Sequence, residues 1–448
     1  MTTRSGKKVI SLFSGALGLD LGLEAAGFKL AVAVEPNPFA VETLKNGKPL
    51  LPVIDRPIER VHTARILQEA GLRSGEAAVV AGGPACQAFS TAGQRGSISD
   101  PRGVLFRSFL RVIRGARPRF FVMENVPGVI SAAKRHRPLI ERGPGHPPLA
   151  RDEEFGSAFI EIVREFRKLG YYIVFDILNA ADFGVPSTRK RLVFIGSRDG
   201  EPIAMPIPTH SETGSDGLKP WVTLREALRG LEDPDPEIKS IATRWRRYLK
   251  QIPAGGCWRD LPKDLQREAM GRAYLSWGGR KGFFRRLSWD APVPALTTRP
   301  ESKATMFCHP DELRTFSIRE YARLQQFSPD WKFSGGVEQR YRQIGNAVPV
   351  GLGQAIGLSL MTAMRRRKEP LRRPFPIVCA GEDLMRRLTR GRRTRLNPVR
   401  MRKVKSLDAT RKWLNGRSRS NGEILKYVVP ASDLNGSYPH PKKKPVEN

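Results

Sequence analysis

Short apolar runs rich in β-branched residues alternate with amphipathic, helix-length segments along the first part of the chain. The runs predict strands at 8–13, 30–35, 77–81, 119–123, 172–178 and 191–196. The segments between them have apolar residues at helical spacing and predict helices at 19–26, 38–46, 104–115 and 156–169. This alternation is typical of an α/β fold with a doubly wound, mostly parallel sheet, covered by helices on both faces.

The pattern changes near residue 200, where Pro, Gly, Trp and Arg become frequent and the periodicity weakens. We therefore expect a first domain, a smaller irregular domain, a segment that returns to the first domain, and a basic tail whose composition suggests partial disorder. The expected boundaries are 1–199, 200–290, 291–364 and 365–448.

The chain has a formal net charge of +33 and an isoelectric point near 10.7, which indicates a polyanionic partner, with nucleic acid as the first candidate. Segment 365–448 holds 24 Lys and Arg against 7 Asp and Glu, and the rest of the chain is basic as well. The tail would either add nonspecific DNA affinity or dock a partner such as a cognate nuclease, and we favour DNA.

The cysteines are widely separated and form no C-x-x-C pair, which argues against a zinc knuckle and against a disulfide framework. The N-terminus lacks the apolar stretch of a signal peptide, and no segment approaches the roughly 18 apolar residues of a membrane span. We therefore expect a soluble, cytoplasmic protein with no membrane partner.

The sequence VISLFSGALGLDLGLEAAGF predicts a strand, a glycine turn and a helix. Gly15 and Gly18 would let the backbone approach a ligand at the helix N-terminus. Glu35 ends the next strand, where a carboxylate commonly binds ribose hydroxyls. Taken alone, the pattern favours a nucleotide-like cofactor and plain strand–helix packing about equally.

The segment AGGPACQAFS places Cys86 directly after a predicted strand and a glycine turn. Thiolates are strong nucleophiles, and this position faces the crevice where doubly wound sheets bind ligands. For an arbitrary cysteine, the role of a small buried apolar side chain is more common. The assignment therefore depends on the neighbours of Cys86.

Two more motifs lie at strand ends. RFFVMENVPGV ends an apolar run with Glu124, a candidate proton donor or partner for a ring nitrogen, although a helix N-cap or a solvated strand end is the ordinary role. GVPSTRKRLVFIG places Arg189 and Arg191 two apart on a strand, so we expect both to point the same way, toward an anion, a carbonyl or Glu124. A solvated basic edge is the alternative for this pair.

These motifs follow the order of the cytosine-C5 DNA methyltransferase family, which the chain resembles over nearly all of 8–364. The matching segments are LFSGALGLDLGLEAAGF, AVEPNPFAVETL, GGPACQAFS, MENVPG, RKRLVFIG and YRQIGNAVPVGLGQAIG. The resemblance implies an enzyme of the bacterial restriction-modification type that uses S-adenosyl-L-methionine, releases S-adenosyl-L-homocysteine and needs no metal. The implied cofactor-binding residues are Phe13, Gly15, Gly18, Glu35, Pro36, Ile58, Pro84, Leu105, Asn346 and Val348.

The resemblance also implies the chemistry. Cys86 would attack C6 of a cytosine that has been rotated out of double-stranded DNA, and Glu124 would bind or protonate N3. Arg189, with Arg191 two residues on, would hold the O2 side of the ring. After methyl transfer to C5, a base would remove the C5 proton and Cys86 would leave by β-elimination.

Segment 200–290 corresponds by resemblance to a target-recognition domain that reads base edges in the major groove. Its aromatic residues, such as Trp258 and Phe284, would either take part in this recognition or form the core of the domain. We expect the protein to act as a monomer on double-stranded DNA, with a restriction endonuclease as a candidate partner. The expected DNA-binding residues are Gln87, Ser90, Arg280, Arg285 and Arg286.

Four residues depart from the family pattern, in which glycine, aspartate, proline and glutamine are usual: Leu17, Pro57, Ala85 and Ser187. The side chain of Pro57 cannot accept a hydrogen bond, so we expect weaker cofactor binding. The departures motivate one rival, a DNA-binding regulator on a disabled scaffold. A second rival is a transfer-RNA cytosine-C5 methyltransferase, since such enzymes share the motif order. The retained motif residues favour an active DNA enzyme.

Overall fold

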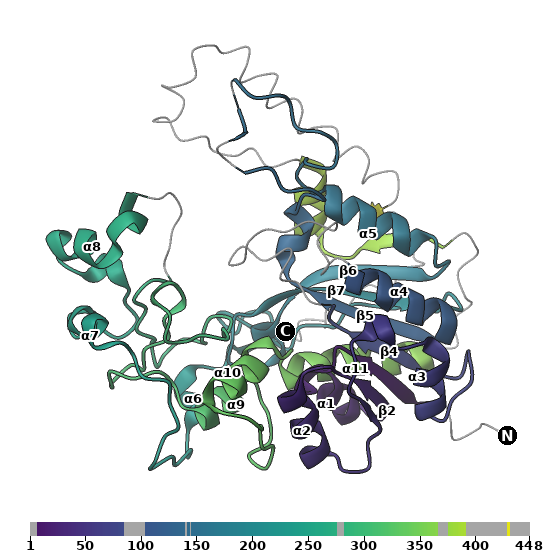
Figure 1. Cartoon of the computed structure of the whole chain (residues 1–448), viewed down its shortest axis with the longest axis horizontal. Coiled ribbons are helices and arrows are strands. Elements are labelled where there is room, and N and C mark those ends of the chain that lie inside the picture. The colour runs from purple at the N-terminus through teal and green to yellow at the C-terminus, as the bar shows by residue number, and fades with distance from the viewer. Residues whose placement is uncertain are drawn as a thin grey trace.

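A computed structural model of the chain describes residues 7–84, 104–138, 141–143, 145–275, 282–365, 375–390 and 428–430. Its main feature is a nine-stranded sheet, flanked by helices and joined to a second lobe (Figure 1). The strands of this sheet are β1 (Lys8–Leu12), β2 (Lys29–Val34), β3 (Val53–Ile54), β4 (Val79–Gly82), β5 (Phe120–Asn125), β6 (Tyr172–Asn179), β7 (Lys190–Ser197), β10 (Ile377–Cys379) and β11 (Val428–Pro430).

The strand order is β11-β10-β6-β7-β5-β4-β1-β2-β3. Within the described part of the chain, the strands of this sheet pair in parallel, except that β7 runs antiparallel to β5 and β6. The predicted α/β class and its mostly parallel, doubly wound sheet are therefore confirmed. The chain order reverses between β1 and β4, and ligands of such sheets bind where the order reverses, beyond the carboxyl ends of the strands.

Strand alternation divides the apolar residues into two cores, one on each face of the sheet. Along β5, Phe121 and Met123 join the first core, whereas Phe120 and Val122 join the second. The first core is covered by α3 (Thr63–Glu69), α4 (Val104–Ala116) and α5 (Ser157–Arg167). The second is covered by α1 (Gly18–Ala25), α2 (Pro38–Gly47) and α11 (Val350–Arg365).

Glycines allow α1 and α11 to pack closely. A Cβ added to Gly22 would lie 2.3 Å from the Val350 carbonyl oxygen, and one added to Gly353 would lie 2.6 Å from the Leu19 carbonyl oxygen. Because these contacts are with backbone atoms, a side-chain rotation could not relieve them. The contact fixes α11 against the helix that follows the glycine turn.

The second lobe contains short helices and little sheet (Figure 1). Its elements are β8 (His210–Ser211), β9 (Lys219–Pro220), α6 (Leu224–Leu228), α7 (Thr243–Leu249), α8 (Lys263–Met270), α9 (Ile318–Leu324) and α10 (Val337–Asn346). One apolar cluster joins Leu224 and Leu287 to Phe316 and Tyr341, so side-chain packing crosses the expected boundary at residue 290. A second cluster buries Phe284 completely.

The chain after residue 365 contributes more structure than its composition suggests. Strand β10 pairs with β6, and β11 pairs with β10, both in parallel register. Helix α12 (Glu382–Arg390) follows β10 and places Leu384 and Leu388 in the first core. The apolar runs that form β10 and β11 are short and lie in this strongly basic C-terminal extension, so they were not assigned from the sequence.

One apolar stretch was missed at the sequence level. Residues 337–365 are long and apolar enough to cross a membrane by length and composition, so the expectation that no segment approaches this limit was wrong. In the structure the stretch comprises α10 and α11, and over half of its most apolar window is buried. Packing of α11 on α1 accounts for its hydropathy.

Candidate active site

The turn after β4 is packed tightly between its two neighbouring strands. A Cβ added to Gly82 would lie 2.5 Å from the Leu12 carbonyl oxygen, and one added to Gly83 would lie 2.7 Å from Oε2 of Glu124. A side chain at Gly82 would therefore meet backbone, and one at Gly83 would displace the Glu124 carboxylate, against which the turn lies. Cys86 itself lies outside the described residues, three positions beyond Gly83 along the chain.

Glu124 and Arg191 form an ion pair at this edge. The Nε atom of Arg191 lies 2.6 Å from Oε1 of Glu124, and about an eighth of each side chain is exposed. The guanidinium also donates a hydrogen bond to the Lys190 carbonyl oxygen at 2.8 Å. Antiparallel pairing of β5 with β7 sets the position of the pair, because Glu124 lies opposite Val193 in the ladder.

Asn125 links the end of β5 to the same turn. Its Nδ2 atom donates a hydrogen bond to the Pro84 carbonyl oxygen at 3.2 Å, while its Oδ1 atom accepts one from the Val126 backbone at 2.9 Å. The side chain is buried, so both bonds are shielded from water. Asn125 thus ties the backbone two residues before Cys86 to the strand that carries Glu124.

The hydrogen bonds of Arg189 reach a different part of the chain from the ion pair of Arg191. The Arg189 guanidinium donates to the carbonyl oxygens of Leu296 at 3.0 Å and Gly345 at 2.9 Å, and only 2% of the residue is exposed. The two guanidiniums therefore hold different groups: Arg189 binds backbone carbonyl oxygens, and Arg191 binds the Glu124 carboxylate. Just before β7, which begins at Lys190, the backbone pairs with Val293, close in sequence to Leu296. That both arginines point the same way stays a prediction.

The switch point of the sheet is the place where the strand order reverses, between β1 and β4. At its other side, the glycine loop contacts the end of β2. The Gly15 N–H donates to Oε2 of Glu35 at 2.8 Å, and the Asn37 N–H donates to Oε1 at 2.9 Å. Burial raises the pKa of the Glu35 carboxyl above its ordinary value, and these two donors oppose the rise. The loop is strongly curved, since Phe13, Gly15 and Leu17 all have left-handed backbone conformations.

Gly18 has a structural reason to be glycine. A Cβ at this position would lie 2.1 Å from the Val348 carbonyl oxygen, so the start of α1 contacts the chain between α10 and α11 directly. This contact brings two expected cofactor residues, Gly18 and Val348, together. Asn346, which ends α10, is exposed on the same segment.

The remaining expected cofactor residues differ in burial. Ile58 is in the first core, and Phe13 and Leu105 pack against that core. Pro84 is buried, whereas Pro36 is exposed. Their roles toward a cofactor stay predictions.

Two residues expected to bind DNA are used inside the second lobe. Arg286 donates hydrogen bonds to the carbonyl oxygens of Ile252, Pro310 and Asp311, at distances of 2.8 to 3.1 Å. Arg285 lies over the Phe307 ring, 5.3 Å from its centroid, and burial lowers its pKa. Both half-buried side chains therefore take part in packing of the lobe, and their expected role in DNA binding stays a prediction.

The other three expected DNA-binding residues, Gln87, Ser90 and Arg280, lie outside the described residues. A basic surface that the sequence did not single out lies on α7. Arg244, Arg246, Arg247 and Lys250 are all exposed there or just after it. The sequence TRWRRYLK contains this signal, since cations interleaved with aromatic residues are common on nucleic-acid-binding surfaces.

The two loops that meet at the switch point define a class of protein. A curved glycine loop contacts an acidic strand end on one side, and an acid–guanidinium pair contacts a glycine turn on the other, as in α/β enzymes that bind nucleotide-like cofactors. Residues 7–362 match the C-5 cytosine-specific DNA methylase family. The chain belongs to this family and is a cytosine-C5 DNA methyltransferase.

Curated relatives agree with this assignment. The chain is 38% identical over 353 residues to the type II methyltransferase M.Sau96I of Staphylococcus aureus, covering 79% of this chain and 75% of the relative. It is 34% identical over 359 residues to the type II methyltransferase M.Eco47II of Escherichia coli, covering 79% and 78%. The family match ends at residue 362, before the C-terminal extension.

Solved structures support the fold. A DNA modification methyltransferase encoded within a prophage of Escherichia coli superposes with a TM-score of 0.55 at 23% identity, covering 80% of this chain and 100% of that one. The Entamoeba histolytica methyltransferase EhMeth superposes with a TM-score of 0.54 at 15% identity, covering 80% and 99%. At these identities the likeness concerns the fold alone.

Proposed function

We propose that the protein transfers a methyl group from S-adenosyl-L-methionine to C5 of a cytosine in a specific double-stranded DNA sequence, through a covalent bond between Cys86 and C6. The observation that carries this proposal is the Arg191–Glu124 pair, which lies against Gly83, three residues before Cys86. It places an acid from β5 and a guanidinium from β7 beside the end of β4, the strand that precedes the expected nucleophile.

The residue types suit this chemistry. Cytosine C5 is a weak nucleophile, and attack of the Cys86 thiolate on C6 turns the ring into an enamine that is reactive at C5. Glu124 holds a proton or a hydrogen bond at N3, which withdraws charge from the ring during the attack. Arg191 forms the ion pair that orients Glu124, whereas Arg189 binds the Gly345 carbonyl oxygen. Arg191 is therefore better placed than Arg189 to assist Glu124 at the ring. Removal of the C5 proton then breaks the Sγ–C6 bond and restores the aromatic ring.

The glycine loop fits the cofactor. A Cβ added to Gly15 would meet no heavy atom within 4 Å, so the loop leaves open space at this point. Each carboxylate oxygen of Glu35 accepts one backbone N–H and keeps a lone pair for a ribose hydroxyl. Bound S-adenosyl-L-methionine supplies an electrophilic methyl group. Phe13, Ile58 and Val348 would orient the cofactor. Side chains of the protein, Cys86 and Glu124, would supply the other reacting groups.

Double-stranded DNA is the proposed substrate because the relatives that share over 30% identity are named as type II methyltransferases, and because the chain is strongly basic. A duplex hides the faces of its bases, so the target cytosine must rotate out to reach Cys86. We propose further that the enzyme acts as a monomer and that its partner is a cognate restriction endonuclease.

The test is transfer of labelled methyl groups from S-adenosyl-L-methionine to mixed-sequence duplex DNA and, in parallel, to transfer RNA. We expect label in DNA alone, and none with Cys86→Ala. Label in transfer RNA alone would replace the substrate, and no label in either would favour a DNA-binding regulator. Bisulfite sequencing of DNA from expressing cells would then identify the recognised sequence.

A further inference from the structure

Gln326, directly after α9, has a backbone conformation that its residue type disfavours. Its φ is 62°, in the left-handed region that side chains other than glycine rarely adopt. Such a conformation persists where surrounding contacts over-determine it, and it often marks a functional position. The contacts of Gln326 therefore need an explanation.

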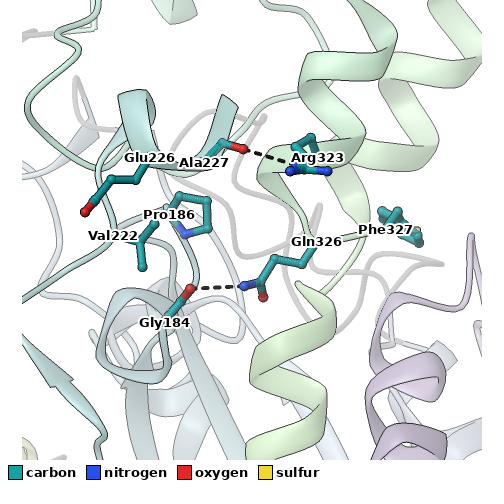
Figure 2. Close-up of a pocket in the computed structure, with 8 residues that line it drawn as sticks. All are labelled: Gly184, Pro186, Val222, Glu226, Ala227, Arg323, Gln326 and Phe327. Atoms are coloured by element: carbon teal, nitrogen blue, oxygen red, sulfur yellow. Dashed lines mark hydrogen bonds between the residues drawn. The ribbon is translucent and has the colours of Figure 1, made fainter. Parts of the chain in front are cut away.

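The side chain of Gln326 joins two segments that are far apart in the sequence. Its Nε2 atom donates to the Gly184 carbonyl oxygen at 3.0 Å, and its Oε1 atom accepts from the Gly351 N–H at 3.1 Å. Figure 2 shows the side chain reaching toward Gly184. Gln326 is also one of the residues that line a cavity of about 340 Å³. Its two hydrogen bonds therefore fix the side chain at the edge of this cavity.

The same short segment is held at further points. The α10–α11 linker, defined here as residues 344–351, comprises the last turn of α10, the three connecting residues and the start of α11. It receives two hydrogen bonds from Nε2 of Gln325, to the carbonyl oxygens of Ile344 at 2.8 Å and of Ala347 at 3.0 Å. Arg189 adds its bond to Gly345. Gln326 fixes the far end of the linker, at Gly351.

The α10–α11 linker also forms one wall of the proposed cofactor site. The Val348 carbonyl oxygen lies so close to Gly18 that no side chain would fit between them. Gly15, three residues earlier, begins the open space proposed for the cofactor. A shift of the linker would therefore change the shape of the glycine loop.

We propose that Gln326 is a positioning residue for cofactor binding: its two side-chain hydrogen bonds hold the α10–α11 linker at the distance from the glycine loop that S-adenosyl-L-methionine requires. This inference rests on the proposed function, which supplies the cofactor. In this role Gln326 acts through the linker.

The experiment compares Gln326→Gly with Gln326→Ala by calorimetric titration with S-adenosyl-L-homocysteine. Both variants lose the two hydrogen bonds, but only glycine also relieves the backbone strain. We expect both to bind about tenfold more weakly than the wild type, the size expected from losing roughly one or two hydrogen bonds. KM for S-adenosyl-L-methionine should rise similarly, while kcat at saturating cofactor stays near that of the wild type.

Gln266→Ala is the matched control, because Nε2 of Gln266 donates to the Arg259 and Leu261 carbonyl oxygens in the second lobe, in the same manner. It should leave cofactor affinity unchanged. If Gln326→Gly does not fold, Gln326→Glu replaces it. Glutamate keeps an acceptor for the Gly351 N–H but has no donor for Gly184, so it should also weaken binding.

Unchanged affinity for S-adenosyl-L-homocysteine in a folded Gln326→Gly protein would overturn the inference. If only Gln326→Ala lost affinity, backbone strain and not the lost hydrogen bonds would be responsible, which would overturn it as well. If Gln326→Glu is measured instead, unchanged affinity in that variant would overturn it. Failure of the wild type to bind S-adenosyl-L-homocysteine contradicts the proposed cofactor itself, so the two failures are distinguishable.

Discussion

At the residue scale, the sequence indicated the partners of some side chains in the site but not those of others. The contact of Glu124 with an arginine was one of the alternatives that the sequence left open. The binding of Arg189 to the carbonyl oxygens of Leu296 and Gly345 was not indicated, because these partners lie over 100 residues away along the chain. The contacts of Arg286 inside the second lobe were not indicated either, because they too depend on the folded chain.

Leu17 shows two opposing effects at one position. Its left-handed backbone costs roughly 1–2 kcal/mol relative to glycine, but its side chain is fully buried in the second core. Removing a buried leucine side chain costs about 2–5 kcal/mol, so Leu17→Gly should lower the free energy of unfolding by ~1–3 kcal/mol, although glycine is usual in the family. Urea unfolding measures the difference, and a stabilised variant would contradict the packing argument.

Asp20 gives a pH dependence whose sign follows from its burial. Burial raises the pKa of Asp20 to about 7 from an ordinary value of 3.8. The folded protein therefore keeps a proton between these values that the unfolded chain releases. Its contribution to the free energy of unfolding is greatest below pH ~4 and declines up to pH ~7, by at most ~1.4 kcal/mol per pH unit.

Asp20→Asn removes this titration. The difference in unfolding free energy between variant and wild type should increase in favour of the variant from pH 4 to pH 7, and then level off. Urea unfolding of both proteins at several pH values gives this difference, and other titrating groups cancel in it. A difference that is independent of pH would show that Asp20 has an ordinary pKa.

At the scale of elements, periodicity predicted most strands and helices of the first part of the chain, because these bury apolar faces. The short elements β3 and α3 were not predicted. Strands β10 and β11 were not predicted. Each has three residues, and their place in the sheet is set by pairing with β6, not by a pattern of their own. The glycines that let α1 and α11 touch can be read in the sequence, but the sequence does not show which helices they bring into contact.

The α1–α11 contact predicts a large effect of a small substitution. In Gly353→Ala, the new methyl group would lie 2.6 Å from the Leu19 carbonyl oxygen, so the helices must separate at a cost of about 1–3 kcal/mol. Leu358→Ala, on an exposed position of the same helix, should change stability by less than about 0.5 kcal/mol. Equal thermal midpoints for the two variants would refute close packing at Gly353.

At the scale of the whole molecule, the sequence indicated a large α/β domain and a smaller irregular one. The structure adds side-chain packing across the expected boundary at residue 290. The second lobe packs residues from both sides of position 290 into one cluster, which the change in composition could not reveal. The C-terminal extension completes the sheet beside β6, although its charge suggested a tail.

Removal of residues 366–448 tests the structural role of this extension. We expect a marked fall in the thermal midpoint, because β10, α12 and β11 bury Ile377, Leu384 and Val428 in the first core. Removal of 431–448 alone keeps every described element and is the control. A midpoint that is the same in both truncated proteins would mean that the extension is not part of the folded domain.

The central claim is that Glu124, held by Arg191 beside the glycine turn, enables Cys86 to bond to cytosine C6. Intact-mass measurement of the adduct with 5-fluorocytosine duplex DNA and S-adenosyl-L-methionine tests it most directly, because fluorine at C5 blocks the final elimination. We expect a stable adduct with the wild type, none with Cys86→Ala, and formation slowed by roughly 10²–10⁴ with Glu124→Gln. An adduct that forms in Cys86→Ala, or at an undiminished rate in Glu124→Gln, would contradict the account.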